Sequence, residues 1–550
     1  MHTRLLLVLT LASTTLAQDP QPLILPGHVL ATGETVVAAG LVAVNNHGVA
    51  LVGATTDNPN SAIDSVYLRD GIVVLRQGDT TSLPSGVSIE LFRSSSLNIN
   101  GDSGWTFKLA GTSSVFEDSG VFFNGNIAIQ AGAISTAPEF SPSTRYRKLH
   151  RATINDSNQI LVVTTVDDPG LPTENDPALM RIDLDGNGSV IGESAVFKEG
   201  DLAPGAAGAT ITSFGARTHQ VVINKRGDVM FTAFLSGGIS DQAVYINSTP
   251  VALSGTPSPV PGRNWGCIGL SGGFDMNNVG DYVVMSTLDG FGPGNFVIVK
   301  NGEVFQQAGQ SLPSIGGVVP ITGFGKRLSI NDRGEVLWTG RWQDPPISGQ
   351  LYLGLFLDDE LLVQTDVTTI DGRLITHLQA IGDHCDMSRN GRYIVFTATP
   401  QPPPTSPSYG GVYMIEREFL GLSYCPAAVN STGISASLSA VGSPHLVDQD
   451  VTLMGQGLPG SVSGLFLFGP DQAQVPLADG LLCVGGAVVS VAPVLKTDPS
   501  GVATRQLNFN APYAASLAPG TANFQLWYRD PMGPGGAGSN LSSGLEVLFQ

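Results

Sequence analysis

Residues 223–231 read Ile223-Asn-Lys-Arg-Gly-Asp-Val-Met-Phe231, and residues 330–338 repeat the pattern as Ile330-Asn-Asp-Arg-Gly-Glu-Val-Leu-Trp338. In both segments Asn follows an apolar residue, Gly stands three positions later, and apolar residues then alternate. The Asn side chain bonds nearby backbone and tolerates a left-handed φ, and Gly accepts the positive φ that a tight turn needs. Each segment therefore predicts the turn of a β-hairpin.

Five further segments carry variants of this pattern. They are Val44–Leu51, Ile99–Phe107, Ile154–Leu161, Met276–Val283 and Met387–Val395. The segment Ile99–Phe107 contains one extra residue, and the segment Ile154–Leu161 has Asn158 in place of Gly. The Asn, or its equivalent, falls at positions 45, 100, 155, 224, 277, 331 and 388. Seven copies at nearly constant spacing indicate a repeat architecture.

A second hairpin follows the first in several copies. Its strands read clearly in Ser65–Leu75, Asn295–Phe305 and Leu351–Val363. Two hairpins per repeat give four antiparallel strands, which form one propeller blade. The sequence therefore predicts an all-β chain with a seven-bladed β-propeller over residues 25–420. A linear β-solenoid is the alternative, although its repeats are usually shorter than about 50 residues.

Composition supports this fold class and excludes several others. Of the 550 residues, 42% are hydrophobic and 13% are charged, which excludes a disordered chain. The 68 Gly and 36 Pro residues exclude a mainly helical protein, because both break helices. The net charge of −19 argues against a nucleic acid partner, since phosphate binding needs clustered Lys and Arg.

The first 17 residues have the features of a signal peptide. His2 and Arg4 form a polar start, Leu5–Leu11 is a short apolar run, and Thr15 and Ala17 favour cleavage after Ala17. No later stretch of about 20 apolar residues predicts a transmembrane segment. We expect a secreted or cell-surface protein.

Residues 425–550 lack the repeat and predict a small C-terminal β-sandwich, because short strands alternate with turn signals. The expected strands are 451–454, 464–468, 486–492, 504–509 and 523–528. The last six residues, Leu545–Gln550, coincide with the recognition sequence of 3C-type proteases. They are either a scar of tag removal or, with Leu541–Ser543, a closing strand.

Four cysteines suit an exported protein, and none has the spacing of a zinc site. Cys425 and Cys483 share the C-terminal region, so we expect a disulfide between them. Cys267 and Cys385 would pair only if the fold brings distant repeats together.

The repeats resemble those of secreted bacterial β-propeller proteins with an Ile-Asn-x-x-Gly-x-Val-x-Phe signature, most of them without an assigned activity. This resemblance implies a seven-bladed propeller and an exported location, and no catalytic residue carries over with it. The segment Gln525-Leu-Trp-Tyr-Arg-Asp-Pro531 is similar to one near the C-termini of exported bacterial proteins. That resemblance implies a terminal module for attachment or sorting.

Two motifs have a chemical and a plain structural interpretation. Gly269-Leu-Ser-Gly-Gly273 matches a nucleophile elbow, but it leads into a strand rather than a helix, and a chance match fits a glycine-rich chain. Asp183, Asp185, Asn187 and Glu193 resemble a calcium loop. Glu193 falls one residue early for such a loop and no helices flank it, so a polar hairpin turn is the alternative.

A third candidate site comes from aligning the repeats. Equivalent positions on the strand before the turn hold His150, His219, Lys326 and Asp383, and His384 follows. If that strand is innermost, these residues ring one mouth of the channel and would bind an anion, a sugar acid or a metal. The alternative is that long polar side chains fill a wet channel without function.

These observations favour an extracellular binding or scaffold protein whose propeller presents a face to an extracellular glycan or protein. An enzyme that cleaves an extracellular polysaccharide or ester at the channel mouth is the first alternative. It would need carboxylates or a His-based set that converge. A self-assembling structural subunit is the second alternative, although nothing in the sequence specifies an assembly interface.

Overall fold

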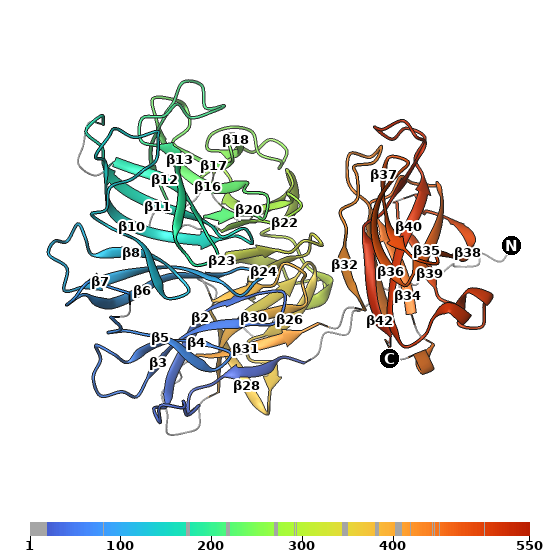
Figure 1. Ribbon diagram of the computed structural model, residues 1–550, viewed down its shortest axis with the longest axis horizontal. Coiled ribbons are helices and arrows are strands. Elements are labelled where there is room, and N and C mark those ends of the chain that lie inside the picture. The colour runs from blue at the N-terminus through green and yellow to red at the C-terminus, as the bar shows by residue number, and fades with distance from the viewer. Residues whose placement is uncertain are drawn as a thin grey trace. The chain divides into compact units, whose positions relative to one another are not determined.

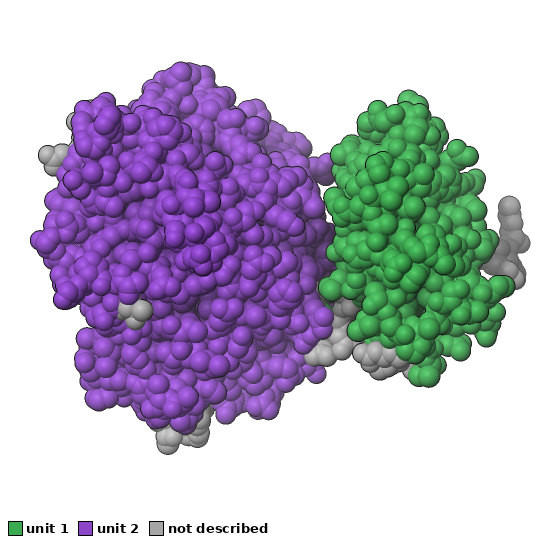
Figure 2. Space-filling model, in the orientation of Figure 1, with its two compact units in different colours: residues 1–17, 417–550 green, residues 18–416 purple. Residues whose placement is uncertain are grey.

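The computed structural model describes residues 19–549 except for 81, 172–175, 216–220, 269–272, 291, 293, 344–349, 380–383, 402–409, 418–419, 443, 445, 450 and 500. Two compact units divide the chain, one formed by Gln18–Glu416 and one containing Arg417–Gln550 (Figure 2). The expected signal peptide lies outside the described residues. Apart from the 3₁₀ turns Pro313–Ile315, Leu446–Asp448 and Pro512–Ser516, the described elements are strands, so the all-β prediction is confirmed. Among these elements there is no helix with the length and apolar character of a membrane span.

Each sequence repeat folds into one antiparallel sheet whose strands lie side by side in chain order (Figure 1). The first three sheets in the described part of the first unit are β2 (Val36–Val44), β3 (Ala50–Thr56), β4 (Ser65–Arg69) and β5 (Ile72–Arg76); β6 (Ser88–Leu97), β7 (Ser103–Ala110), β8 (Ser119–Phe123) and β9 (Asn126–Gln130); and β10 (Arg145–Ile154), β11 (Gln159–Asp167), β12 (Asp176–Leu184) and β13 (Val190–Lys198).

Three more sheets follow the same plan, although the first strand of the fourth sheet is split in two. They are β14 (Thr210–Phe214) and β15 (Val222–Ile223) with β16 (Val229–Ser236), β17 (Gln242–Ile246) and β18 (Thr249–Leu253); β19 (Phe274–Met276), β20 (Tyr282–Thr287), β21 (Phe296–Lys300) and β22 (Glu303–Gln307); and β23 (Ile321–Ile330), β24 (Val336–Gln343), β25 (Leu351–Leu357) and β26 (Glu360–Gln364).

The seventh sheet of the described residues joins both ends of the unit. It contains β27 (Thr369–Ile370), β28 (Arg373–Leu378), β29 (Cys385–Met387), β30 (Tyr393–Pro400) and β31 (Gly411–Glu416). Its last strand is β1 (Gln21–Ile24), which pairs with β31 in antiparallel register, Gln21 opposite Met414. The predicted start at residue 25 therefore missed one strand, because β1 is short and carries no repeat signature.

The first strands of successive sheets contact one another, and the last contacts the first. The contacts run through β2, β6, β10, β15, β19, β23 and β29, and from β29 back to β2. Apolar clusters fill the space between neighbouring sheets. One cluster combines Leu161 and Leu179 of the third sheet with Phe231 and Tyr245 of the fourth. Each sheet is therefore buried on both faces, which explains the continuous apolar run Ile160–Val163 in β11.

The structure corrects the alignment of the second repeat. There the turn Asn is Asn98 and not residue 100, because the Asn98 side chain accepts the backbone N–H of Asp102 and Gly101 takes the positive φ. The segment Asn98-Ile-Asn-Gly101 then fits the pattern without an extra residue. In the third repeat Asn158 has a φ of +56°, so Asn replaces Gly there as expected.

The C-terminal unit has a larger and a smaller sheet. The larger contains β32 (Leu422–Tyr424), β42 (Gly544–Phe549), β40 (Gly520–Arg529), β35 (Ser463–Gly469), β38 (Val489–Lys496) and β41 (Ser539–Leu541); the smaller contains β33 (Ser437–Gly442), β34 (Val451–Gln456) and β39 (Ala503–Gln506). β36 (Asp471–Leu477) and β37 (Gly480–Gly485) pair with each other and form a separate two-stranded hairpin. One apolar cluster contains Leu453 of the smaller sheet and Phe466 and Leu526 of the larger.

The C-terminal segment that coincides with a protease recognition sequence forms a strand of this unit. β42 pairs with both β40 and β32. Leu545, Val547 and Phe549 are buried in the apolar cluster, while Leu548 is 58% exposed. In the structure the closing-strand interpretation therefore holds for Gly544–Phe549.

Candidate functional site

The repeat Asn residues connect neighbouring sheets around the middle of the first unit. Each Asn uses its side-chain oxygen for backbone N–H groups of its own turn, as Asn277 does for Gly280 and Asp281 at 2.8 Å each. For five of these residues the amide N–H₂ also donates to the backbone carbonyl of the next repeat's Asn. These links run from Asn45 to 98 (3.2 Å), 98 to 155 (3.3 Å), 155 to 224 (2.8 Å), 224 to 277 (3.2 Å) and 277 to 331 (2.8 Å).

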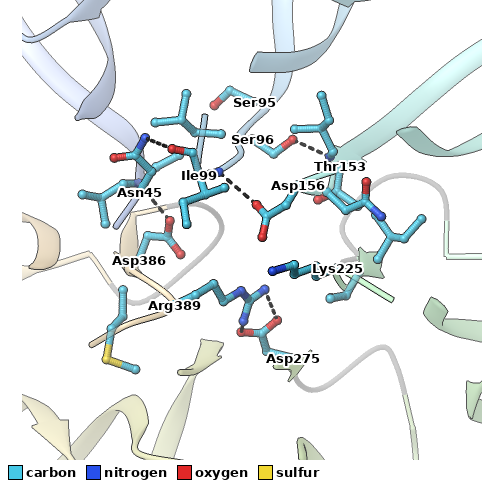
Figure 3. A pocket seen from close by; sticks show the side chains of 18 of the residues that line it. Asn45, Ser95, Ser96, Ile99, Thr153, Asp156, Lys225, Asp275, Asp386 and Arg389 are labelled. Carbon is cyan, nitrogen blue, oxygen red and sulfur yellow. Dashed lines mark hydrogen bonds and ion pairs between the residues drawn. The ribbon is translucent and has the colours of Figure 1, made fainter. Parts of the chain in front are cut away.

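A polar cavity lies beside this ring of turns, where the first strands of the sheets end (Figure 3). The cavity has room for water over about 110 Å³, and its mouth is open to solvent. All seven sheets contribute to its lining. The charged and amide side chains of the lining are Asn45, Asn46, Arg151, Asn155, Asp156, Lys225, Asp275, Asn278, Arg327, Asp386 and Arg389.

Two ion pairs in the lining join different sheets. Arg389 donates to both oxygens of Asp275, at 3.0 and 3.2 Å, and to the carbonyl of Ile330. Asp275 is 2% exposed, and its Oδ2 also accepts the Ile330 N–H. Burial alone would lower the pKa of Arg389, but the Asp275 carboxylate outweighs burial and raises that pKa. The guanidinium therefore stays charged at every accessible pH.

The second pair is Arg327 with Asp386, at 3.1 Å. The other Asp386 oxygen accepts the Val44 N–H of the first sheet at 3.1 Å. Burial raises the pKa of Asp386, and the Arg327 guanidinium opposes that shift. The Arg327–Asp386 pair joins neighbouring sheets, and the Arg389–Asp275 pair joins the seventh sheet to the fifth; the carboxylates of both pairs already have partners.

Lys225 and Asp156 are the more available charges. Lys225 is exposed and extends into the cavity, and the structure gives its ammonium no ion pair among the described residues (Figure 3). Asp156 accepts the Ile99 N–H with one oxygen at 2.9 Å. Hydroxyl groups of Ser95, Ser96 and Thr153 complete this side of the lining. The arrangement offers a cation, a carboxylate and neutral hydrogen-bonding groups to a small polar ligand.

The predicted channel residues are only partly described. His219 and Asp383 lie outside the described residues. His150 lies in β10 and Lys326 in β23, but the cavity is lined by the next residues, Arg151 and Arg327. His384 packs against Gly40 of the first sheet, since a Cβ at Gly40 would lie 3.1 Å from the imidazole. The convergence of all five residues stays a prediction.

Two cavity residues that the alignment missed, Arg151 and Arg327, stand one position after His150 and Lys326, whereas Asp156 and Lys225 stand six positions after His150 and His219. β10 has an irregular register between Leu149 and Ala152, and β23 has one between Phe324 and Leu328. Because successive side chains of a strand point to opposite faces, such a shift exchanges the residue that faces the cavity. The signal in the sequence was the basic cluster around residues 145–151, which contains Arg151.

The calcium-loop candidates do not meet at one point. Asp183 lies opposite Gly192 and Ile182 lies opposite Glu193, so Asp183 and Glu193 point to opposite faces of the sheet. Asp183 accepts the Gln159 amide at 2.8 Å, and Glu193 accepts the Tyr146 hydroxyl, also at 2.8 Å.

Between these strands, Asp185 caps its own turn. Its Oδ1 accepts the backbone N–H groups of Ser189 (2.8 Å) and Asn187 (2.9 Å), which lower the pKa of the carboxyl. A calcium site in this hairpin stays a prediction and would need another conformation. The nucleophile motif falls mostly on 269–272, outside the described residues.

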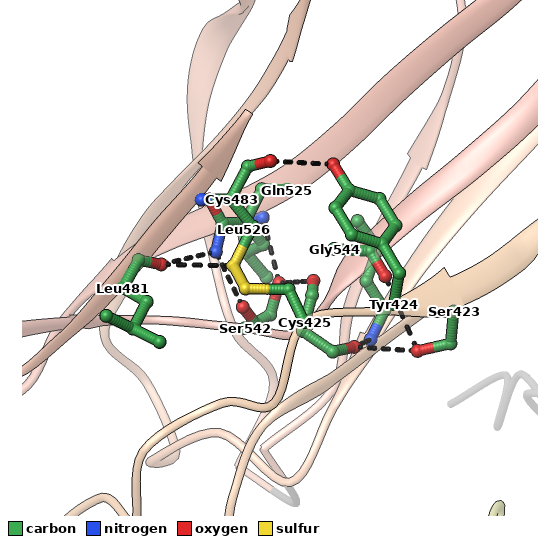
Figure 4. The surroundings of a disulfide bond; sticks show 11 residues. Ser423, Tyr424, Cys425, Leu481, Cys483, Gln525, Leu526, Ser542 and Gly544 are labelled. Atoms are coloured by element: carbon green, nitrogen blue, oxygen red, sulfur yellow. Dashed lines mark hydrogen bonds between the residues drawn. A yellow bond between two sulfur atoms is a disulfide. The ribbon is translucent and has the colours of Figure 1, made fainter. Parts of the chain in front are cut away.

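The expected disulfide between Cys425 and Cys483 is present (Figure 4). Cys483 lies on β37 and is fully buried, and Cys425 follows β32. The Tyr424 hydroxyl donates to the Cys483 carbonyl at 2.8 Å and fixes the same junction. Cys267 and Cys385 are not bonded to each other in the structure.

No family model and no curated protein matches the chain. Among solved structures, the extracellular domain of the hybrid two component system BT3049 from B. thetaiotaomicron is similar over 93% of this chain and 55% of that one, with 10% identity and a TM-score of 0.32. A puromycin hydrolase complexed with PGG is similar over 66% of this chain and 50% of that one, with 10% identity and a TM-score of 0.35.

The polysaccharide lyase Uly1 is similar over 67% of this chain and 85% of that one, with 9% identity and a TM-score of 0.27. This chain spans only about half the length of the first two structures. At these identities and TM-scores the likenesses carry no argument about what this chain binds or does.

Proposed function

We propose that the protein is an extracellular binding protein in which a seven-bladed β-propeller presents a small polar ligand site and a C-terminal β-sandwich serves attachment or sorting. The seven sheets and the cycle of contacts between their first strands support the propeller. The single observation that carries the binding role is the polar cavity, because every sheet contributes to its lining.

Binding explains the cavity better than catalysis does. General acid–base chemistry needs a titratable group that is free to exchange a proton with the substrate. Asp275 and Asp386 instead hold Arg389 and Arg327 and accept backbone N–H groups. No His, Cys or Tyr is among the described residues that line the cavity.

The lining favours an acidic saccharide as the ligand. Lys225 would pair with a ligand carboxylate, since its ammonium is exposed to the cavity and a charged hydrogen bond is stronger than a neutral one. Asp156 and the hydroxyls of Ser96 and Thr153 would hydrogen-bond sugar hydroxyls. A chain with a net charge of −19 would repel such a ligand elsewhere, so the local cation matters.

The test is calorimetric titration of the full chain with a panel of neutral and uronic-acid oligosaccharides. We expect a uronic-acid member to bind and Lys225→Ala to weaken its binding about tenfold, the loss of roughly 1.4 kcal/mol. Lys496→Ala is the matched control, because Lys496 is an exposed lysine of the C-terminal unit. If no saccharide binds, or if both variants lose affinity equally, the proposal fails.

The same panel tests the enzymatic alternative. Each saccharide is incubated with the protein and the mixture is analysed for shorter products or for new unsaturated ends. Turnover that Asp156→Asn abolishes would replace the binding role by hydrolysis or lyase chemistry at the cavity, because Asp156 is the lining carboxylate without an ion pair among the described residues. Intact saccharides are the expected result.

A further inference from the structure

A pair of acidic side chains belongs to the C-terminal unit, whereas the cavity and the predicted calcium loop belong to the first unit. Asp479 is in the turn between β36 and β37, and Asp530 directly follows β40. The glycine-rich segment Pro531–Gly538 connects Asp530 to β41. Neither carboxylate forms an ion pair with a described Lys or Arg.

Each carboxylate uses one oxygen for a backbone group and leaves the other without a donor. Asp530 Oδ2 accepts the Ser431 N–H at 3.0 Å, and Asp479 Oδ1 accepts the Ala537 N–H at 2.8 Å. Asp530 Oδ1 and Asp479 Oδ2 are buried and have no hydrogen-bond partner in the structure. The Asp530 residue is 0% exposed, so water at the surface does not solvate it.

The two carboxylates face each other across Gly533. A Cβ at that position would lie 2.5 Å from Asp479 Oδ2 and 2.8 Å from Asp530 Oδ2. A Cβ at Gly535 would clash with Asp479 as well. Glycine is therefore required by the close approach of the two carboxylates, whose Oδ2 atoms lie close together on one side of Gly533. Ca²⁺ takes oxygen ligands at roughly 2.3–2.6 Å, so it is the kind of ion that such a close pair suits.

Asp530 is fully buried and Asp479 is partly buried, and a buried carboxylate without a counter-charge is unfavourable because it loses its hydration. A hard divalent cation removes that cost and prefers oxygen ligands. We infer that Asp479 and Asp530 bind one Ca²⁺ ion, which joins the β36–β37 hairpin to the segment before β41. Backbone carbonyls and water supply the remaining ligands, since no three His, Cys, Asp or Glu side chains form a metal-binding group in the described part of the chain.

Tyr528 provides a spectroscopic probe of this site. The Tyr528 hydroxyl accepts the Asn430 amide at 3.4 Å, and the next residue, Ser431, donates its N–H to Asp530, so the phenol lies close to the site. A bound Tb³⁺ ion emits strongly when a close phenol transfers its excitation energy. We expect Tb³⁺ to luminesce in the chelator-treated full chain and Ca²⁺ to displace it.

Calorimetric titration with CaCl₂ then measures the site directly. The wild-type chain should bind one equivalent, while Asp530→Asn and Asp479→Asn should bind at least tenfold more weakly. Asp471→Asn on the same hairpin is exposed and serves as the control that keeps full affinity. Gly533→Ala tests the site without removing a ligand, because the added methyl group intrudes between the two carboxylates.

Two results would overturn the inference. Wild-type protein that binds no Ca²⁺ at millimolar concentration and gives no Tb³⁺ signal would mean that the two carboxylates do not form an ion site. Binding that is lost with Asp185→Asn but kept with Asp530→Asn would place the ion in the hairpin of the third sheet. Circular dichroism of each variant confirms that the loss is not unfolding.

Discussion

Asp358 is a buried carboxyl whose ionisation destabilises the folded state. It occupies the tight turn after β25 with a φ of +48°, and its Oδ1 accepts the Val336 N–H at 2.9 Å. Burial raises the pKa of this carboxyl to about 6, and the nearby Glu335 charge adds to the shift. The equivalent turn position is Asn in three other sheets, where Asn124, Asn247 and Asn301 accept the same kind of N–H.

Asp358→Asn should therefore stabilise the protein at neutral pH. The folded state holds a proton on Asp358 more tightly than the unfolded chain does, so the stability of the wild-type protein falls as pH rises from about 4 to 6. We expect the variant to gain about 1–2 kcal/mol at pH 7 and to lose that part of the pH dependence. Denaturant unfolding at pH 4 and pH 7 measures both effects, and an equal change at the two pH values would contradict the assignment.

The residue types of the turns could be predicted from the sequence, but the partners of Asn277 and its equivalents could not. Asn tolerates turn geometry within one repeat, and that local role is readable at Asn158, which takes a positive φ. The hydrogen bond from the Asn277 amide to the next sheet depends on how the sheets pack against each other, and the sequence of one repeat does not indicate which backbone group of its neighbour will lie nearby. Likewise, Arg151 and Arg327 became visible only with the irregular register of their strands.

At the level of the elements, the stability contributed by the hydrogen bond between sheets can be measured separately from the stability contributed by the turn. Asn277 and Asn331 are both fully buried and both donate to a carboxylate four residues later, at 3.1 and 2.7 Å. Only Asn277 also donates to a backbone carbonyl of the next sheet; the further contact of Asn331 is the Met387 sulfur at 3.6 Å.

Asn277→Asp should therefore destabilise the protein by about 1–2 kcal/mol more than Asn331→Asp, since it alone leaves a buried carbonyl without its donor. Both substitutions keep the oxygen that caps the turn and place a second carboxylate beside the first. The difference between their unfolding free energies isolates the cross-sheet bond. Equal losses would show that the amide acts only within its own turn.

The closing strand β42 gives a second test at this level. Phe549 is 2% exposed within the apolar cluster, and the adjacent Leu548 is 58% exposed on the other face of the strand. Phe549→Ala should cost about 3–5 kcal/mol, whereas Leu548→Ala should change stability by less than about 0.5 kcal/mol. Calorimetric melting of the two variants checks this, and similar losses would mean that the segment does not pack as a strand.

For the molecule as a whole, the separation of two compact units predicts two unfolding transitions. The Cys425–Cys483 disulfide lies entirely in the C-terminal unit. Replacing both cysteines by Ser should therefore destabilise that unit by about 2–4 kcal/mol and leave the transition of the first unit unchanged. Cys267→Ser is the control, because Cys267 is outside the disulfide. A shift of both transitions in the double variant would show that the units unfold together.

The repeats could be read from the sequence because six of the seven copies have Asn at the turn and the seventh has Ser388, and several C-terminal strands could be read because apolar residues alternate there. The way the first unit closes could not be read. Gln21–Ile24 has four residues and no turn motif, and nothing local to it indicates a partner near Met414. Pairing between the two ends of a unit is decided by the geometry of everything between them.

That closure fixes an order of events during biosynthesis. A nascent chain exposes Gln21–Ile24 first and Gly411–Glu416 only after the rest of the unit has left the ribosome, so the first unit cannot finish folding while it is being made. A proteolytic cut between β1 and β2 would release a short peptide and uncover the backbone N–H and C=O groups of β31. An uncovered strand edge recruits strands from other molecules. Loss of a few N-terminal residues would thus make the first unit prone to aggregate, although none of the residues that line its cavity is removed.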